Sequence, residues 1–308
     1  MNRMMDHHGH PVVATFSIIA FDEKEQEWGV AVQSKFLAAG ALVPWAMAET
    51  GALATQSFAN TSFGPRGLRM LADGKEPEAV LWDLLADDPE RQLRQVGIVD
   101  AKGRSATFTG SSCLSWAGGI AEPGFACQGN VLAGEGVIEG MADYFRASSN
   151  DSPLAERLVR ALEVGQEAGG DKRGMQSASL LVVKKDGGFG GWNDRMIDLR
   201  VDEHHRPIAE LKRILSLHRL YFQRSKPEDF LPLKGDHLEE VKDLLRQAGY
   251  TPGAGEEYDG KTREALKTFY LRENFDDRWK NEPVVDRRVL EYMRHFQEEQ
   301  GKKPAFDQ

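Results

Sequence analysis

Two apolar runs near the start of the chain constrain its fold more than any other feature. Phe16–Phe21 and Gly29–Gln33 have the length of strands and are separated by a charged turn at Asp22–Glu27, a pattern typical of a β-hairpin. Neither run alternates cleanly between apolar and polar residues, so both faces of the hairpin must be covered. We therefore expect sheet packed on sheet, with helices outside both.

Further segments of strand and helix length follow the hairpin in mixed order. Strands are predicted for apolar or β-branched segments between turn signals: Gly51–Ser57, Arg94–Val99, Ser105–Thr109, Phe125–Gln128, Ser177–Lys184 and Met196–Val201. Helices are predicted where apolar residues recur at helical spacing: Pro65–Asp73, Pro77–Ala86, Val137–Arg146, Pro153–Ala168 and Ile208–Phe222. Hairpins with helices grouped between them indicate antiparallel sheets with helical layers, which is an α+β arrangement.

The character of the chain changes at Arg224–Asp229. Beyond this segment the charge density is high, β-branched runs disappear, and helices are predicted for His237–Gln247, Lys261–Arg272 and Val284–Gln297. A unit of about 75 residues is close to the lower limit for a stable core. We therefore divide the chain into a flexible leader at 1–14, a larger domain at 15–223 and a small all-helical domain at 230–308.

Composition limits which partners the protein can have and which cellular compartment it is expected in. The chain has 308 residues and a net charge of −9, and this acidic balance argues against a nucleic-acid partner. No run approaches the ~18 apolar residues of a membrane span, and residues 1–14 lack the apolar core of a secretory signal, so the cytoplasm is the expected compartment. Cys113 and Cys127 are too few for a disulfide framework and are predicted to be buried free thiols. Neither a metal nor an organic cofactor is predicted.

Thr15 stands at the head of the first strand and is the leading candidate for a nucleophile. A threonine hydroxyl is a weak nucleophile unless a base activates it, and a free amine on the same residue is one such base. Cleavage between Ala14 and Thr15 would create that amine, whose reference pKa near ~7.7–8.0 suits proton transfer at neutral pH. Ser34 and Lys35 end the second strand and are expected beside it, where the lysine charge would favour the neutral amine and the developing alkoxide. The alternative is that Thr15 simply begins a strand, where threonine is favoured.

Polar residues at strand ends supply the other candidates. Those at or just past a predicted strand end are Gln56, Asn60, Gln128, Asn130, Gln176, Asn193 and Asp194. Amide side chains there would donate to a tetrahedral oxyanion, with Asn60 and Gln128 as the oxyanion donors and the others as substrate-binding residues. The alternative is that they cap turns. The charged loop Asp171–Gly174, which includes Arg173, precedes a buried strand and would orient the amine of the nucleophile or a substrate carboxylate, with Asp171 as its candidate catalytic residue. The alternative is a solvated turn with a local ion pair.

Nine segments of the chain carry a resemblance to a known family: Thr15–Ile18, Gly29–Phe36, Gly40–Trp45, Ala54–Asn60, Gly64–Gly67, Gln128–Gly134, Gly169–Ser177, Asn193–Asp194 and Leu217–Phe222. They are similar to motifs of a bacterial family whose function is unknown and which resembles the N-terminal-nucleophile (Ntn) hydrolases. That superfamily includes proteasome β-subunits and several amidases and acylases. The resemblance implies a four-layer αββα sandwich over the larger domain.

The start of the chain departs from the family pattern. Many members begin Met-Thr-Phe-Ser-Ile, so removal of the initiator methionine bares their threonine. Here 14 residues precede Thr15. Three outcomes stay open: cleavage before Thr15, a mis-assigned start codon, or a protein that keeps the fold without the chemistry.

The segment from Asp236 to Phe296 resembles a peptidoglycan-binding domain. The similarity rests on the turn-and-helix sequence Tyr258–Phe269. The resemblance implies peptidoglycan binding, with dimer formation or covering of the active site as the alternatives.

The resemblance and the strand-leading threonine lead to one functional hypothesis with an alternative. The hypothesis is an Ntn amidohydrolase that cleaves a non-peptide amide C–N bond of a small molecule, with Thr15 as the nucleophile and water clearing the acyl-enzyme. The alternative is a non-catalytic binding protein of the Ntn fold whose tail binds peptidoglycan or a protein partner. Because related sandwiches assemble into rings and dimers, a homo-oligomer is also expected.

Overall fold

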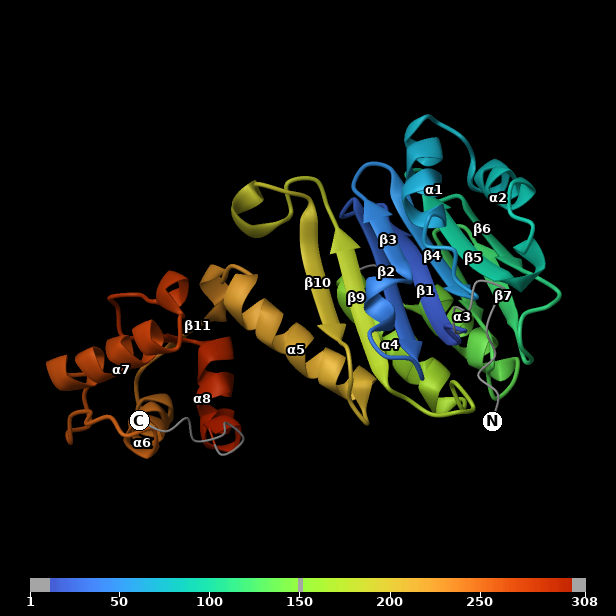
Figure 1. The fold of residues 1–308 in the computed structure, drawn as a ribbon. Coiled ribbons are helices and arrows are strands. Elements are labelled where there is room, and N and C mark those ends of the chain that lie inside the picture. The colour runs from blue at the N-terminus through green and yellow to red at the C-terminus, as the bar shows by residue number, and fades with distance from the viewer. Residues whose placement is uncertain (1–11, 149–151, 301–308) are drawn as a thin grey trace, which may run out of the picture. The chain divides into compact units, whose positions relative to one another are not determined.

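The computed structural model describes residues 12–148 and 152–300, with side chains as far as residue 296 (Figure 1). The chain divides into two compact units, Met1–Leu215 and Ser216–Gln308. Within the described ranges there are eight α-helices, the sheets are antiparallel, and the C-terminal region is mainly helical. The predicted α+β class is therefore confirmed.

The first unit is built on two antiparallel sheets. The larger has the strand order β10-β9-β2-β1-β8-β7 and the smaller the order β3-β4-β5-β6. The strands of the larger sheet are β1 (Thr15–Asp22), β2 (Glu27–Ser34), β7 (Gly118–Glu122), β8 (Phe125–Gly129), β9 (Ser177–Val183) and β10 (Arg195–Val201). Those of the smaller sheet are β3 (Pro44–Met47), β4 (Gly51–Ser57), β5 (Arg94–Asp100) and β6 (Ser105–Thr109). The predicted hairpin, β1 with β2, therefore lies at the centre of the larger sheet.

The pairing register gathers several strand ends around Thr15. Thr15 pairs with Ser34, and Ser34 pairs with Ser177 on β9. On the other side of β1, Phe16 pairs with Gly129 on β8. The start of β1, the ends of β2 and β8 and the start of β9 thus share one end of the larger sheet.

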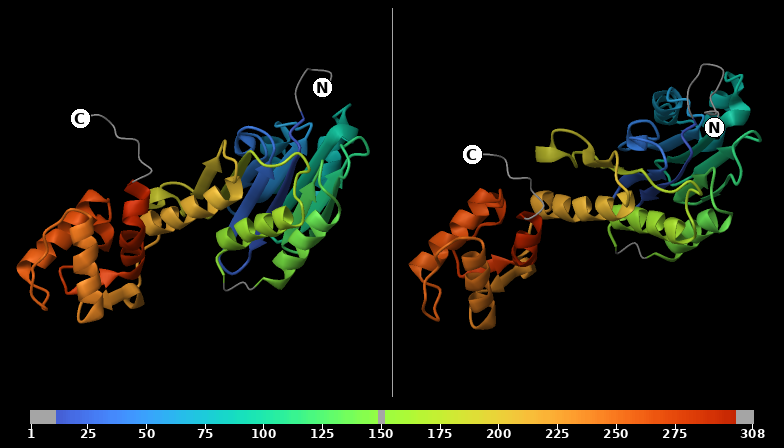
Figure 2. Two further views of the ribbon diagram at one scale, coloured as in Figure 1. Left: turned by 90° about the horizontal axis from the view of Figure 1, so that it is seen from below. Right: turned by 60° about the horizontal axis from the view of Figure 1, so that its bottom comes forward.

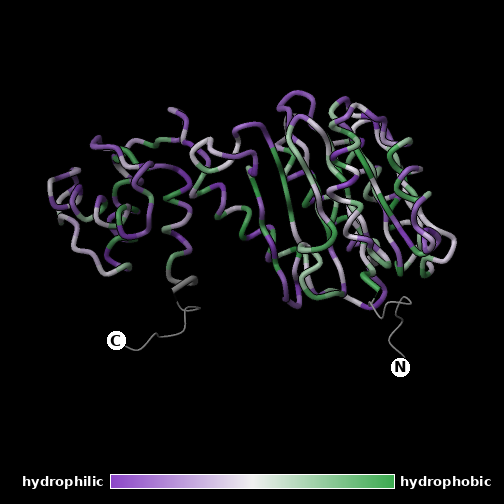
Figure 3. Tube along the Cα trace, turned by 45° about the horizontal axis from the view of Figure 1, so that its top comes forward, coloured by the Kyte–Doolittle hydropathy of each residue, from purple (hydrophilic) through white to green (hydrophobic). Residues whose placement is uncertain are grey.

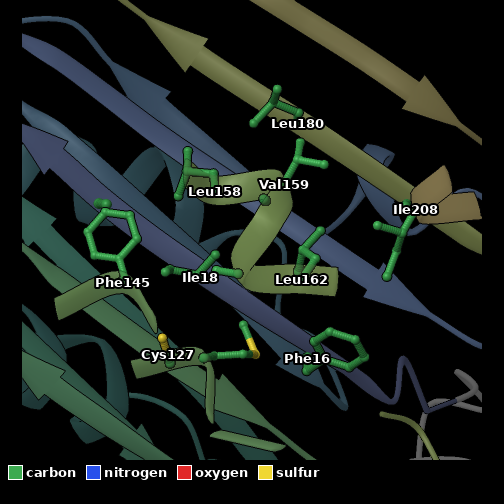
Figure 4. Close-up of a cluster of buried hydrophobic side chains, with 14 of the residues drawn as sticks. Phe16, Ile18, Cys127, Phe145, Leu158, Val159, Leu162, Leu180 and Ile208 are labelled. Atoms are coloured by element: carbon green, nitrogen blue, oxygen red, sulfur yellow. The ribbon is translucent and has the colours of Figure 1, made fainter. Parts of the chain in front are cut away.

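Helices cover one face of each sheet in the first unit. They are α1 (Phe63–Ala72), α2 (Pro77–Ala86), α3 (Gly136–Ala147), α4 (Leu154–Glu167) and the start of α5 (Pro207–Phe222). Apolar side chains of α1 and α2 cluster with β4 and β5 of the smaller sheet. Those of α3, α4 and α5 cluster with the larger sheet, and α3 packs beside α4 (the green helices in Figure 2). Figure 4 shows Phe16 and Ile18 of β1 with Leu158 and Leu162 of α4 in this second cluster.

A third apolar cluster takes side chains from both sheets. It contains Ile19 and Val32 from the larger sheet and Ala54 and Val99 from the smaller. Successive side chains of a strand point to opposite faces, so β1 buries Ile18 against the helices and Ile19 against the other sheet. Each such buried side chain stabilises the fold by about 1.5–3 kcal/mol. This two-sided burial explains why the strand sequences do not alternate, and Figure 3 shows hydrophobic residues along the strands of this unit.

The second unit is a small helical unit with its own core. It contains α6 (Asp236–Gln247), α7 (Gly260–Arg272), α8 (Arg287–Gln300) and a two-stranded ribbon of β11 (Phe230–Pro232) and β12 (Val284–Asp286). Its core includes Leu238, Phe269, Tyr270, Phe275 and Leu290. Among the described residues of both units, short 3₁₀ turns lie at Ala39–Ala41, Arg91–Leu93, Phe189–Gly191, Pro227–Asp229 and Asp276–Arg278.

The predicted helix Val284–Gln297 is wrong in its first three residues. These residues form β12, and α8 begins at Arg287. Two consecutive valines favour a strand because their β-branched side chains are restricted in a helix. Asp286 then accepts the backbone N–H of Arg288 at 2.8 Å, which is the geometry of a helix start.

The structure also tests the predictions about the cysteines and about membrane spans. Cys113 and Cys127 are free thiols; Cys127 is buried as predicted, and Cys113 is half-buried. Burial raises the pKa of both thiols. Among the described residues, the helices are too short or too polar to cross a membrane.

Candidate functional site

Thr15 is enclosed at one end of the larger sheet. Its exposed fraction is 0%. The hydroxyl Oγ1 donates to the backbone carbonyl of Val13 at 2.9 Å and lies 3.2 Å from Oγ of Ser34. The predicted proximity of Thr15 and Ser34 follows from their pairing in the β1–β2 hairpin.

The three residues ahead of Thr15 are packed into the fold. Val12, Val13 and Ala14 are all buried. The backbone N–H of Val13 donates to the carbonyl of Ser57 at 2.7 Å, and the N–H of Ser57 donates to the carbonyl of Val13 at 3.1 Å. The predicted flexible leader at 1–14 therefore does not extend to residues 12–14. These three residues are buried, and the backbone of Val13 pairs with that of Ser57 in both directions. Residues 1–11 lie outside the described residues.

The carbonyl of Ala14 receives two side-chain hydrogen bonds. Oγ of Ser34 donates to it at 2.6 Å, and Nη2 of Arg173 donates to it at 3.2 Å. A hydroxyl and a guanidinium directed at one carbonyl oxygen would stabilise negative charge developing there. This carbonyl belongs to the peptide bond between Ala14 and Thr15.

Arg173 is oriented by Asp171. The Asp171 side chain is fully buried and forms an ion pair with Nη2 of Arg173 at 2.7 Å. Nε of Arg173 donates to the second carboxylate oxygen at 3.0 Å, so the contact is bidentate and fixes the plane of the guanidinium. Oδ2 of Asp171 also accepts the backbone N–H of Lys35 at 3.4 Å. Asp171 thus links the Arg173 loop to the end of β2.

Lys35 and Gln176 reach this end of the sheet mainly through their backbones. The ammonium of Lys35 is directed to the carbonyl of Met175, at 3.2 Å in an exposed position. The backbone N–H of Gln176 donates to the carbonyl of Ser34 at 2.9 Å. Both residues therefore help to hold β2 and β9 together beside Thr15.

A chain of buried polar side chains runs between the two sheets next to Thr15. Nε2 of Gln56 is within 3.3 Å of the Thr15 carbonyl and 2.9 Å of Oε1 of Gln95. Oγ of Ser17 donates to Oε1 of Gln56 at 2.6 Å, and Nε2 of Gln128 lies 2.6 Å from the same hydroxyl. The amide of Gln128, expected to hold an oxyanion, is thus directed to Ser17.

Asn130 completes this chain of polar side chains. Its Nδ2 donates to Oε1 of Gln95 at 2.8 Å, and its backbone N–H donates to the Thr15 carbonyl at 3.0 Å. Its Oδ1 is buried without a hydrogen-bond partner in the structure. A buried acceptor of this kind is costly unless something binds it.

Asn60 lies in a second polar cluster, around Arg94. Its Nδ2 donates to Oδ2 of Asp88 at 3.1 Å. Nε of Arg94 donates to the same oxygen at 2.8 Å, and its other nitrogens donate to Glu90 and to the Phe58 carbonyl, each at 2.7 Å. Burial alone would raise the pKa of Asp88, but its hydrogen bonds from Arg94, Asn60 and the backbone of Glu90 together lower it. Asn60 is thereby engaged in holding the loop after β4.

Asn193 and Asp194 lie at the opposite end of the larger sheet from Thr15. They precede Arg195, which pairs with Val183 at the far end of β9, and a strand of this length spans about 20 Å. Their side-chain oxygens accept backbone N–H groups of the β9–β10 turn at 2.9 and 3.0 Å. The structure therefore separates these two residues from Thr15 and supports their alternative interpretation as turn caps.

Ser17 and Gln95 were not among the sequence candidates, and Arg173 was predicted only as part of the charged loop Asp171–Gly174. Ser17 interrupts the apolar run of the buried strand β1, and Gln95 follows Arg94 at the start of the buried strand β5. A buried polar residue in a strand is a usable signal. Arg173 contacts Ala14 across 159 positions of the sequence, a separation at which no local pattern operates. Among the described residues, clusters of three or more side chains suited to a metal ion are absent.

Two surface cavities among the described residues of the first unit lie away from Thr15. One of about 400 Å³ is lined by Met47, Val183 and Arg195. Another of about 270 Å³ is lined by Trp82 and Phe108. Thr15 lines neither of these two.

Comparison with known proteins gave matches for both units. The model of the family of unknown function DUF1028 matches residues 15–211, and the model described as "Putative peptidoglycan binding domain" matches residues 221–293. Among solved structures, the crystal structure of protein SPO2555 from Silicibacter pomeroyi, of the DUF1028 family, is similar with a TM-score of 0.60 and 28% sequence identity. The alignment covers 73% of this chain and 92% of that one. Curated proteins gave no match.

Proposed function

This chain belongs to the DUF1028 family, and we propose that it is an Ntn amidohydrolase whose nucleophile, Thr15, is released by cleavage of the Ala14–Thr15 peptide bond. The mature enzyme would hydrolyse a non-peptide amide C–N bond of a small molecule. Thr15 would attack the carbonyl carbon, its own amine would carry the proton, and water would clear the acyl-enzyme.

The packing of the first unit supports the Ntn part of the proposal. Helices α1 and α2 pack on the smaller sheet, α3 and α4 pack on the larger, and one apolar cluster joins the two sheets. This order corresponds to the four-layer αββα sandwich that the family resemblance implies. The central pair β1 and β2 carries Thr15 at one end of the larger sheet.

The observation that carries the proposal is the environment of the Ala14 carbonyl. Ser34 and Arg173 donate to its oxygen, and the Thr15 hydroxyl lies 3.2 Å from the Ser34 hydroxyl. Attack by Oγ1 on the Ala14 carbonyl carbon would place negative charge on an oxygen that already has two donors.

The proposed self-cleavage balances without any added reagent except water. A bond forms between Oγ1 of Thr15 and the Ala14 carbonyl carbon, the C–N bond breaks, and the hydroxyl proton passes to the nitrogen. Hydrolysis of the resulting ester returns the hydroxyl and leaves Thr15 with a free amine. In later turnovers the same two donors, Ser34 and Arg173, would hold the substrate carbonyl.

Intact-mass analysis of the purified full-length protein tests this proposal. The expected product is a chain beginning at Thr15. Thr15→Ala should stay uncleaved because it has no hydroxyl, whereas Thr15→Ser should still cleave. A wild-type chain that stays whole during prolonged incubation would sink the self-activating mechanism.

A second candidate function rests on the match of residues 221–293 to a peptidoglycan-binding model. In this version the tail binds peptidoglycan or a protein partner and the first unit is a non-catalytic binding domain. Sedimentation of the full chain with insoluble peptidoglycan tests it. Binding that is equal for wild type and Thr15→Ala, with no cleavage in either, would favour this candidate over the hydrolase.

We also propose that the protein is cytoplasmic and forms a homo-oligomer. Size-exclusion chromatography with light scattering tests the oligomer. A measured mass equal to that of one chain over a wide range of protein concentration would contradict the homo-oligomer.

A further inference from the structure

We propose that Val12–Ala14 marks the acyl groove of the mature enzyme, and that its substrate has a short, extended, uncharged N-acylated aminoacyl group ending in a small aliphatic unit. The inference rests on the proposed cleavage before Thr15 and adds the acyl half of the substrate. The segment occupies the acyl side of the bond that Thr15 would attack, so its contacts define what that side accepts.

The position next to the reacting carbonyl is small and apolar. Ala14 has an exposed fraction of 0%. It clusters with Val12, Phe58 and Val131. Because this packing already encloses the methyl group, a larger side chain would require its neighbours to move. The acyl unit at this position is therefore alanyl or of similar size.

The next position binds through the backbone of its occupant. Ser57 both donates to and accepts from the backbone of Val13, at 3.1 and 2.7 Å. Ser57 has a φ of 68°, which is uncommon for a residue with a side chain. Backbone held in such a region is frequent at binding sites. An occupant must present both an N–H and a C=O to Ser57, as an acylated amino acid does.

Two guanidinium groups beside the groove are already paired. Arg94, whose Nη1 donates to the Phe58 carbonyl, is held by Asp88 and Glu90. Arg173 pairs with Asp171 while it donates to the Ala14 carbonyl. A charged side chain in the groove would be buried without a partner, which is costly. The groove therefore favours uncharged occupants.

The same contacts predict that the released leader binds as a product. After cleavage it ends in Val12-Val13-Ala14 with a new carboxylate near Ser34 and Arg173. Apart from the broken bond, each contact of the segment described above remains available. A peptide of this sequence should therefore compete with substrate.

Peptide binding to a chain with Thr15 at its start provides the test. The family match begins at residue 15, so such a chain retains the whole family domain. It is prepared with the recognition sequence of an added protease in place of the leader, which makes the test independent of self-cleavage. Binding is measured calorimetrically with acetyl-Val-Val-Ala carboxylate as the probe.

Three altered peptides examine the separate contacts. N-methylation of the second valine removes the donor to Ser57 and should weaken binding about tenfold. Replacing the alanine by phenylalanine should weaken it by at least about tenfold through overpacking. Replacing the second valine by glutamate keeps the backbone N–H and C=O that pair with Ser57 but adds a buried charge. This peptide should bind least well.

A pair of protein variants completes the test. Phe58→Ala should weaken binding of the acetyl-Val-Val-Ala probe, whereas Phe189→Ala, at a position 80% exposed in the β9–β10 turn, should not. If the chain binds all four peptides with equal affinity, or binds none of them saturably, the proposed acyl groove is wrong. The proposed function is judged separately, by the mass of the natural chain, so the two failures are distinguishable.

Discussion

Ser34 is the residue on which the proposed chemistry depends most directly after Thr15. It lies opposite Thr15 in the hairpin and donates to the Ala14 carbonyl at 2.6 Å. We predict that Ser34→Ala slows self-cleavage by about 10²–10³-fold, the usual effect of removing one oxyanion donor. Time-resolved intact mass measures the rate.

A neighbouring serine provides the matched control for Ser34. Ser177 pairs with Ser34 on the next strand and is equally buried, but its hydroxyl bonds backbone groups of Phe36 and Ala39. Ser177→Ala should leave the cleavage rate within about twofold of wild type. Equal slowing by both substitutions would mean that Ser34 acts through packing rather than through its hydrogen bond.

Asp88 gives a prediction about acid stability. Its pKa is lowered in the folded protein: burial alone would raise it, but the hydrogen bonds from Arg94, Asn60 and the backbone of Glu90 outweigh this effect. The unfolded chain then takes up the proton first, so this contribution to stability is present above the ordinary pKa near ~3.9 and is lost as pH falls through the lower folded value.

The corresponding variant is Asp88→Asn. We expect a loss of ~3 kcal/mol at neutral pH, because Arg94 loses a buried partner, and a smaller difference from wild type near about pH 3. Thermal unfolding over this range measures both. Asp87→Asn is the control, since Asp87 is the adjacent carboxylate with a side chain 76% exposed. A difference from wild type that stays constant with pH would contradict the assigned pKa.

The strands most predictable from sequence were those bounded by clear turn signals. The predicted bounds of β1, β2, β4 and β5 lie close to the observed ones, and those of the half-buried β6, Ser105–Thr109, match them. β3 and β7 were not predicted. Each is short and lies at the edge of its sheet. An edge strand pairs with one neighbouring strand only, so it tolerates the proline of β3 and the glycines of β7, which are weak strand signals in a sequence.

The candidate site was predictable only where the hairpin register decides it. The pairing of Thr15 with Ser34 follows from one local turn. The contact of Arg173 with Ala14 and the chain from Gln56 to Gln128 depend instead on how distant segments meet. Polarity in an apolar strand marks a residue as unusual but does not identify its partner.

The approach of the two sheets can be tested at Gly97 on β5. A Cβ at this position would lie 2.1 Å from Oε1 of Gln128 on β8. Gly97→Ala should therefore displace this amide and destabilise the protein by about 1–3 kcal/mol, as measured by chemical denaturation. Gly134→Ala is the control, because nothing lies within 4 Å of its added Cβ.

A double-mutant cycle identifies the cause of the Gly97 effect. If the clash with Gln128 dominates, Gly97→Ala should cost markedly less in a Gln128→Ala background than in wild type. Residues in contact show coupling of about 0.5–3 kcal/mol. Strict additivity of the two substitutions would mean that the backbone of β5, rather than the inter-sheet contact, limits this position.

At the scale of the whole molecule, the two units have separate cores and separate family matches. The matches cover residues 15–211 and 221–293, and the apolar cluster around Phe269 contains only residues of the second unit. We therefore predict that the two units unfold in separable steps. Phe269→Ala should destabilise the second unit by ~3–5 kcal/mol, the usual cost of removing a buried phenylalanine.

Calorimetry and the cleavage assay together test this independence. The transition of the second unit should move down in temperature, while that of the first unit and the rate of cleavage before Thr15 should stay unchanged. Leu271→Ala, on the same helix and 46% exposed, should change neither transition by more than about 0.5 kcal/mol. If Phe269→Ala instead moves both transitions together, the units unfold cooperatively, and the second unit then contributes to the stability of the site that holds Thr15.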